Sequence, residues 1–351
     1  MPTDIFVGTT AAAIKGTLLE KGTIEKLAES TTLDELVNRL KGTPYIEYLT
    51  KVSPPFTALA LELAFRERLA DVHFMMMNLT KSFELISSYY LKQIAWDLKS
   101  VLKSKALGRS VEESMGYLTM HAEELVGRRD LIVKILSARD IQEVPSLLAG
   151  TEFGKDVSEA VSVFSARKEI RTFDLFIDHA VMSGISKAFS IRAGDYKSSR
   201  AVDVAGIREM VALDINSLNV LSVLRAKLWK LPEEETRGLV LNPIAGAGFV
   251  NVQSMINVDS VPEAIKLVQG SIHDALQTGG TDEESIDLIE GYLVGESSRV
   301  ARKSFAWQGL DVSGALALVK CLEFEIRNLA AISIGIEARI DTKIVLSKLV
   351  N

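Results

Sequence analysis

The stretch TLDELVNRLKGT, at residues 32–43, decides how the rest of this chain is interpreted. It returns as DIQEVPSLLAGT at residues 140–151 and as SVPEAIKLVQGS at residues 260–271. Every interval from the first residue to the glycine is the same in the three copies. The chain therefore contains an internal repeat, and we expect the copies to fold alike.

Each copy has the pattern of a short helix that is closed at both ends. The first residue suits the N-cap, and the glutamate three residues later completes a capping box. The glycine suits the C′ position with a positive φ, which costs glycine no Cβ clash. The N-caps are Thr32, Asp140 and Ser260, the glutamates are Glu35, Glu143 and Glu263, and the glycines are Gly42, Gly150 and Gly270. We predict helices at 33–41, 141–149 and 261–269, with the second distorted because Pro145 removes a helical hydrogen bond.

A second box recurs further along each copy and sets the length of the repeat. It centres on Asp97, Asn219 and Asn328, and in the first two copies basic residues follow it at 103, 105, 225 and 227. The period is about 110–120 residues, which is too long for a solenoid of 20–50-residue units. We therefore expect three similar helical domains at 1–125, 126–240 and 241–351, arranged around a pseudo-threefold axis.

Composition places the chain among folded, mostly helical proteins. It has 351 residues, 47% hydrophobic residues, 8 prolines and no sustained two-residue alternation of the kind that marks a sheet. Its 40 basic and 46 acidic residues give a net charge of −6, which makes nucleic acid an improbable partner. The single cysteine and the absence of a signal-peptide pattern predict a cytoplasmic protein, and no apolar stretch approaches the ~20 residues of a membrane span.

Several of these boxes together resemble one known family. The matching positions are Phe6, Ala13 and Lys15, then 33–35 through 42–45, then 103–105, 225–227 and 325–329. In this order and spacing the chain is similar to the C subunit of archaeal and bacterial A/V-type ATP synthases, a relative of the vacuolar ATPase d subunit. It departs from the family pattern at Thr10, at Asp97 where the family usually has Asn, and at 334–336.

The resemblance implies an all-helical funnel of three similar domains. It implies a non-catalytic central-stalk subunit that links the rotating axle to the membrane rotor ring of proteolipid subunits and transmits torque for proton or sodium transport. Such a subunit lies on the cytoplasmic side of the membrane and touches the membrane only through the ring. It has no catalytic, cofactor-binding or metal-binding residues and needs no cofactor.

Four features of the sequence are of the kind that enzymes or metal sites use. The histidines at 73, 121, 179 and 273 show no metal-ligand spacing. Asp174 and Asp178 lie one turn apart beside His179, but Arg167 and Arg171 favour surface ion pairs over an acid/base site. The run 246–251 begins like a dinucleotide loop yet lacks the third glycine, and Cys321 is expected to be a buried structural thiol.

The basic residues Lys103, Lys105, Arg225 and Lys227 have two interpretations. They either meet carboxylates of a partner or cap carbonyls at a helix C-terminus, and we favour the cap. Two other functions remain open for the whole chain. A stand-alone helical adaptor would show the same repeats, and a helical enzyme would need a buried cluster of titratable groups in a deep pocket.

Overall fold

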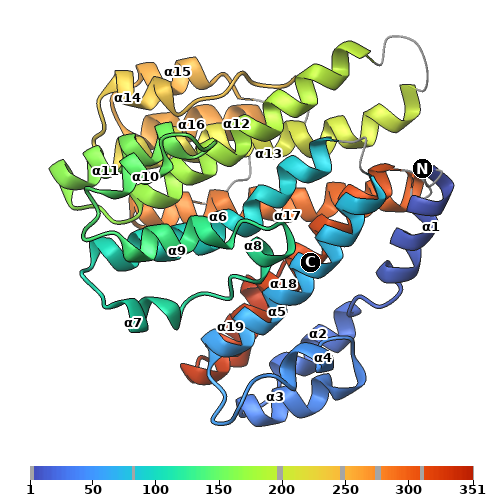
Figure 1. Ribbon diagram of the computed structural model, residues 1–351. Helices are drawn as coiled ribbons and strands as arrows, with labels where there is room; N and C mark the ends of the chain where they lie inside the picture. The colour runs from blue at the N-terminus through green and yellow to red at the C-terminus, as the bar shows by residue number, and fades with distance from the viewer. Residues whose placement is uncertain are drawn as a thin grey trace. The chain divides into compact units, whose positions relative to one another are not determined.

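The computed structural model describes residues 4–80, 84–195, 201–245, 250–272, 278–308 and 312–350. Throughout these residues the regular structure is helical, with no strand (Figure 1). The prediction of an all-α protein is confirmed. The chain forms two compact units, one made of Met1–Asp97, Val111–Ile132 and Ala301–Asn351, the other of Leu98–Ser110 and Val133–Val300.

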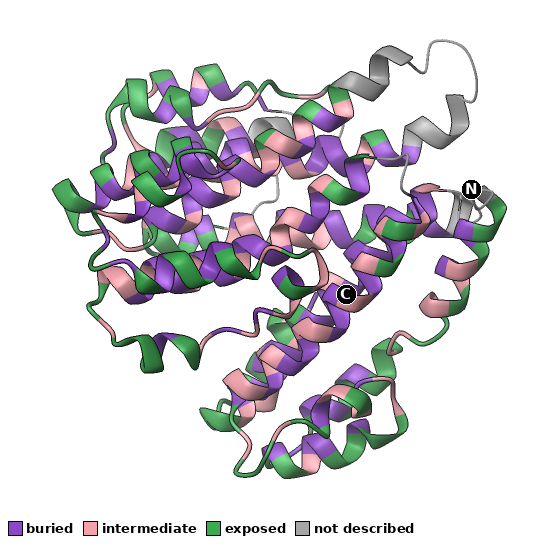
Figure 2. Cartoon of the chain, in the orientation of Figure 1, coloured by how far each residue is buried: buried purple, intermediate pink, exposed green. Residues whose placement is uncertain are grey.

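The first unit is built around one helix that is apolar on nearly every side. Its elements are α1 (Asp4–Lys15), α2 (Lys21–Ala28), α3 (Leu33–Arg39), the 3₁₀ helix η1 (Leu40–Gly42), α4 (Ile46–Leu49), α5 (Ala58–Leu79), α7 (Val111–Met115), α8 (His121–Leu125), α18 (Val312–Glu337) and α19 (Thr342–Lys348). Most residues of α18 are buried, as expected of a helix without a polar face (Figure 2). It packs along α5 and α1, and α2, α3 and α19 cover it further along. At Gly335 a Cβ would lie 2.4 Å from Val345 Cγ2, so the missing side chain lets α19 approach α18.

The second unit is built around α13 (Ala201–Leu228), which α12 (Thr172–Asp195), α14 (Glu233–Gly238), α15 (Val252–Asn257) and α16 (Val261–Ile272) contact. Its other helices are α10 (Val144–Leu148) and α11 (Gly154–Arg167). The core contains Val220, Val223 and Leu224 of α13, packed with residues of α15 and α16. Three helices begin in one unit and end in the other: α6 (Glu84–Ala106), α9 (Arg129–Ser137) and α17 (Asp282–Gln308).

In all three copies the predicted N-cap side chain accepts from the amide three residues later, but the predicted return bond from the glutamate to the N-cap amide is present only in the third. The Thr32 hydroxyl accepts from Glu35 N at 3.1 Å, and the Ser260 hydroxyl accepts from Glu263 N at 3.4 Å. Asp140 Oδ1 accepts from Glu143 N at 3.2 Å, but α10 begins only at Val144, so the second helix is shortened as predicted from Pro145. In the first two copies the glutamate carboxylate accepts from the backbone N–H of the residue before the cap. In the third copy it accepts from that N–H and from the N–H of the cap residue itself.

The prediction that the glycines end these helices with a positive φ is wrong. Neither Gly42 nor Gly150 has a positive φ, and α16 continues through Gly270 to Ile272. In the first two copies the following threonine satisfies the last carbonyls instead. The Thr43 hydroxyl donates to Leu40 O at 2.7 Å and accepts from Tyr45 N at 3.3 Å. Thr151 makes the same pair of bonds, to Leu148 O and from Phe153 N.

Candidate functional site

The second repeated box places a buried polar side chain on each of the long helices α6, α13 and α18. In the second copy Asn219 Nδ2 donates to Leu241 O at 2.9 Å, while its Oδ1 accepts from Leu241 N at 2.8 Å. In the third copy Asn328 makes the same two bonds with Val350, at 2.9 and 2.8 Å. Each asparagine thus fixes a returning loop 22 residues later in the chain.

The path from helix to loop is also the same in all three copies. Eleven residues after the buried polar residue, the chain adopts a positive φ at Gly108, Lys230 and Arg339. At each of these ends two backbone bonds close the last turn in the Schellman pattern, such as Leu231 N to Ala226 O and Lys230 N to Lys227 O. A short helix then follows, α7, α14 or α19. We call these segments, 97–120, 219–241 and 328–350, the exit elements.

The first exit element differs at its central residue. Asp97 Oδ2 accepts from Met120 N at 2.7 Å, which corresponds to one of the two bonds that each asparagine makes. An ionised carboxylate has no N–H with which to make the other bond. The first copy therefore lacks the bond from the side chain to a loop carbonyl that each asparagine makes.

The basic residues after the box all make contacts within the chain. Lys105 Nζ donates to Ala138 O at 2.5 Å, just beyond α9, and Lys227 Nζ donates to Ile256 O at 3.0 Å near the end of α15. They therefore cap carbonyls, as we favoured, but at the C-termini of following helices rather than of their own. The two other basic residues form ion pairs, Lys103 with Asp174 and Arg225 with Glu290, each at 2.6 Å.

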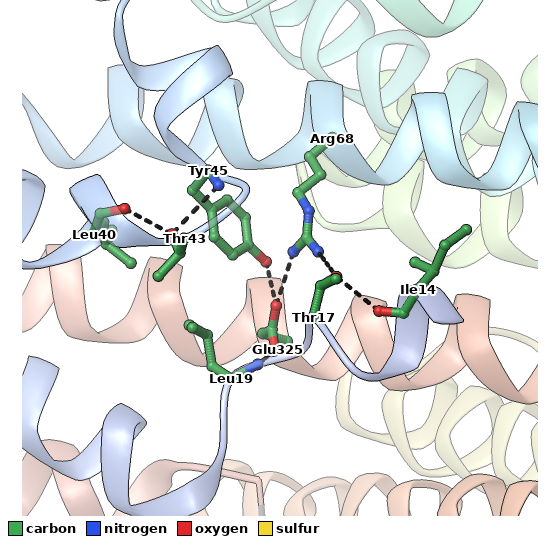
Figure 3. A network of polar contacts seen from close by, with 8 residues as sticks. All are labelled: Ile14, Thr17, Leu19, Leu40, Thr43, Tyr45, Arg68 and Glu325. Carbon is green, nitrogen blue, oxygen red and sulfur yellow. Dashed lines mark hydrogen bonds and ion pairs between the residues drawn. The ribbon is translucent and has the colours of Figure 1, made fainter. Parts of the chain in front are cut away.

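A buried ion pair in the first unit joins segments from both halves of the sequence (Figure 3). Glu325 of α18 accepts from Arg68 of α5 at 3.0 Å and from the Tyr45 hydroxyl at 2.6 Å, and its other oxygen accepts from Leu19 N. Arg68 also donates to the Thr17 hydroxyl at 3.1 Å. Burial, and then the charge of Glu325, raises the pKa of Tyr45 well above its usual value, so its hydroxyl remains a donor. We call this cluster the Glu325 hub.

Sequence reasoning did not identify the Glu325 hub, although Tyr45 and Glu325 lie within the boxes used above. The sequence around both residues does not single them out, because Arg68 stands beside Glu67 and Arg66, and Glu325 stands between Glu323 and Arg327. Charged residues are almost never fully buried unless they are paired. What the sequence lacked was the pairing itself, across 257 residues of chain.

The described histidines lie apart from one another and each has its own partner. His73 is fully buried with Nε2 3.0 Å from Ile86 O, and burial lowers its pKa to about 4. His121 Nε2 lies 2.8 Å from Asp71 Oδ1, and His179 Nδ1 lies 2.5 Å from Asp156 Oδ1. His273 lies outside the described residues. Within those residues, no three His, Cys, Asp or Glu side chains gather as metal ligands would.

The acidic pair beside His179 is not an acid/base site with it, since His179 contacts Asp156. The expected ion-pair partners are also corrected. Asp174 and Asp178 pair with Lys103 and Lys99 of α6. Arg171 instead pairs with Glu169 at 3.0 Å, and Arg167 donates to Trp229 O at 3.1 Å. Both arginines precede α12, so they do not share a helical face with the aspartates.

Cys321 is buried in α18, and burial raises the pKa of its thiol, in agreement with a structural role. Most of the loop that begins like a dinucleotide motif, residues 246–249, lies outside the described residues. None of the helices, within the described ranges, is long and apolar enough to cross a membrane.

The fold and these contacts define an all-helical chain that repeats one structural element three times along its length. Residues 8–347 match the model of the ATP synthase (C/AC39) subunit family, and the chain belongs to this family. Similar proteins include the A-type ATP synthase C subunit of Thermococcus onnurineus, 24% identical over 328 residues that cover 92% of this chain and 83% of the relative. The corresponding protein of Desulfurococcus sp. is 24% identical and covers 93% and 84%. That of Methanocaldococcus jannaschii is 27% identical and covers 68% and 60%.

Proposed function

We propose that this chain is the non-catalytic central-stalk subunit of an A/V-type ATP synthase, where it links the rotating axle to the membrane rotor ring. The observation that carries the proposal is the family match over residues 8–347, together with relatives that are named as C subunits of A-type ATP synthases. In this role the chain transmits torque for proton or sodium transport. It sits on the cytoplasmic side of the membrane and contacts the membrane only through the ring.

We propose further that the chain is organised as three similar domains, at 1–125, 126–240 and 241–351, around a pseudo-threefold axis. Support comes from the three exit elements, which repeat the same positive-φ helix end at equal spacing and bind a loop amide 22 or 23 residues after the buried polar residue. Three walls of similar shape suit a socket that grips a helical axle at several places. The opposite rim then meets the ring over a broad surface.

A torque-transmitting part has to resist deformation between its two contacts. The exit elements supply such resistance because each ties the end of a long helix to a loop through a buried polar side chain. The Glu325 hub ties α5 and α18 of the first unit to the segment that follows α1 and to the residue that precedes α4. Buried polar contacts of this kind are directional, so they oppose sliding of one helix along another.

A bridging experiment tests the proposal. The purified chain is mixed with a purified head–axle complex, with a purified rotor ring in detergent, and with both together. We expect it to bind each alone and to bring the two into one particle. A chain that binds neither would be a stand-alone adaptor or an enzyme, and the coupler proposal would be wrong.

A further inference from the structure

Two acidic side chains are buried where the first exit element meets α8. Asp97 is 2% exposed and Glu123 of α8 is 0% exposed. Asp97 Oδ1 and both carboxyl oxygens of Glu123 find no donor among the described residues. Asp97 Oδ2 accepts from the N–H of Met120, three residues before Glu123, and the two carboxyl groups act on each other's pKa. Two carboxylates supply only acceptors, so a hydrogen bond between them forms only when one of them carries a proton.

Two arginines, Arg66 and Arg128, lower the pKa of this pair, but by less than burial raises it. Arg66 of α5 forms an ion pair with Glu62 at 2.7 Å, and its guanidinium carbon lies 3.2 Å from the centre of the Trp96 ring. The negative charge of Glu323 of α18 also acts on Arg66. Arg128, which follows α8, and Tyr90 of α6 are the other titratable groups that act on Glu123. Tyr90 stays neutral, because burial raises its pKa well above the usual value, and its hydroxyl donates to Ala122 O.

The balance of these effects favours protonation. Burial, and then the charge of Asp97, raises the pKa of Glu123 to about 8. Burial raises the pKa of Asp97 to about 6, although the amides of Met120 and Thr119 oppose that rise. These values describe the pair, which loses its protons in two steps. Near neutral pH the pair therefore holds one proton.

A second contact holds the same short helix. His121, the first residue of α8, lies 2.8 Å from Asp71 Oδ1 of α5, and Tyr48 donates to the other oxygen of Asp71 at 2.8 Å. The hydrogen bond to Asp71 raises the pKa of His121, with Glu67 adding to the effect and Lys51 opposing it. The helix has only five residues, and the residue before it, Met120, has a φ of 53° without a side-chain cap. Such a helix depends on its tertiary contacts.

We propose that Asp97 and Glu123 bind one shared proton at neutral pH, and that this proton makes α8 a pH-sensitive latch on α5 and α6. Loss of the proton leaves two adjacent buried negative charges, which repel and are poorly solvated. His121 also loses its positive charge as pH rises. Both contacts therefore weaken together as pH rises, and α8 with its flanking loops is released.

The sign of the pH dependence follows from proton binding. An unfolded glutamate has its ordinary pKa near 4.5, so above that value the native pair binds more protons than the open state until the pair is deprotonated near pH 8. A difference of one proton increases the opening equilibrium constant about tenfold per pH unit. Between pH 6 and 8 we therefore expect the opening equilibrium constant of the latch to rise by this factor for each pH unit.

Hydrogen exchange of the α8 amides in the full chain tests the proposal, after correction for the intrinsic exchange rates. The variant Glu123→Gln keeps the shape and supplies a permanent donor to Asp97. We expect hydrogen exchange in Glu123→Gln to lack the component of the pH dependence that comes from the Asp97–Glu123 pair. In the wild type this component corresponds to the loss of about one proton between pH 6 and 8. Glu124→Gln, an exposed neighbour on the same helix, should retain the wild-type dependence. Equal pH dependence in the wild type and Glu123→Gln would overturn the proposal.

Infrared spectroscopy gives a second test that needs no variant to fold. The wild type at neutral pH should show the carbonyl-stretch band of a protonated carboxylic acid in a buried position. The band should disappear as pH is raised through about 8. A wild-type spectrum without such a band at neutral pH would show that the pair is fully ionised, and the latch would have no proton to lose.

Discussion

The second and third exit elements each begin with a buried asparagine, but the helices that lead into them carry different residues one turn earlier. Comparing the two separates contacts that recur in each copy from contacts that belong to one copy. Asn219 and Asn328 make identical pairs of bonds with the backbone of their own loops. Three residues before them stand Asn216 and Glu325, both buried. Asn216 again binds nearby backbone, at Ile244, whereas Glu325 binds groups more than 250 residues away in the chain.

The shared position therefore maintains each copy by itself, and the position one turn earlier decides whether a copy also binds distant segments. In the first copy this earlier position is Ile94, which is apolar and buried. The three copies thus have an apolar residue, an amide and a charge at one site. Only the charged residue requires a partner from elsewhere in the chain.

Breaking the long-range contact should have the largest effect. Replacing Arg68 by Leu leaves Glu325 buried without its cation, and removing one partner of a buried pair costs about 3–5 kcal/mol. We expect a lower free energy of unfolding for the first unit, measured by urea denaturation. Arg66→Leu, on the same helix but outside the hub and paired with Glu62 at a more exposed site, is the matched control. Equal losses for the two variants would mean that the hub has no special role.

Breaking a repeated contact should cost less and should be similar in two copies. Asn219→Ala and Asn328→Ala each leave a backbone N–H and a C=O without their partner, at about 1–2 kcal/mol per group. We expect losses of about 2–4 kcal/mol in each, since the two sites have the same geometry. The exposed Asn242→Ala serves as the control. A large loss at one site with none at the other would refute the equivalence of the copies.

Much of this organisation could be predicted from the sequence, because capping and repetition are local. The N-caps at 32 and 260, the distortion of the second copy and the importance of positions 97, 219 and 328 followed from side-chain type and spacing. The positions and conformations of the helix ends could not be predicted in this way. Glycine at 42 and 150 suggested a positive φ, but a threonine hydroxyl one residue later supplies the same hydrogen bonds without it.

The polar contacts were less predictable because their partners are distant in sequence. Lysines 105 and 227 were expected to cap carbonyls, but that the carbonyls belong to following helices depends on packing. The positive φ at Lys230 and Arg339 is likewise invisible in the sequence, since neither is glycine. Only Gly108 in the first copy has the residue type that this conformation favours.

The N-caps provide a smaller comparison among the copies. Thr32→Ala and Ser260→Ala should each lower the free energy of unfolding by about 0.5–2 kcal/mol, because an amide of the first turn loses its acceptor. Asp140→Ala should cost less than either, since α10 starts three residues later than the repeat would place it. Thermal melting measures all three variants. Unchanged melting of Thr32→Ala and Ser260→Ala would contradict the cap assignment.

The helix ends should give the smallest effects and differ in sign among the copies. Lys230→Gly and Arg339→Gly are expected to stabilise by up to about 1 kcal/mol, because glycine adopts a positive φ without strain. Gly108→Ala should destabilise by a similar amount. Melting temperatures that move in the same direction for all three would show that these helix ends are not equivalent.

The central claim is that the chain couples rotation to ion transport without chemistry of its own. The most direct measurement compares ATP-driven ion uptake with ATP hydrolysis in vesicles that contain the complete complex or a complex lacking this chain. We expect hydrolysis by the head to persist without the chain while ion uptake is lost, and addition of the purified chain to restore uptake. Ion uptake that is unchanged without the chain, or ATP hydrolysis by the chain alone, would contradict the account.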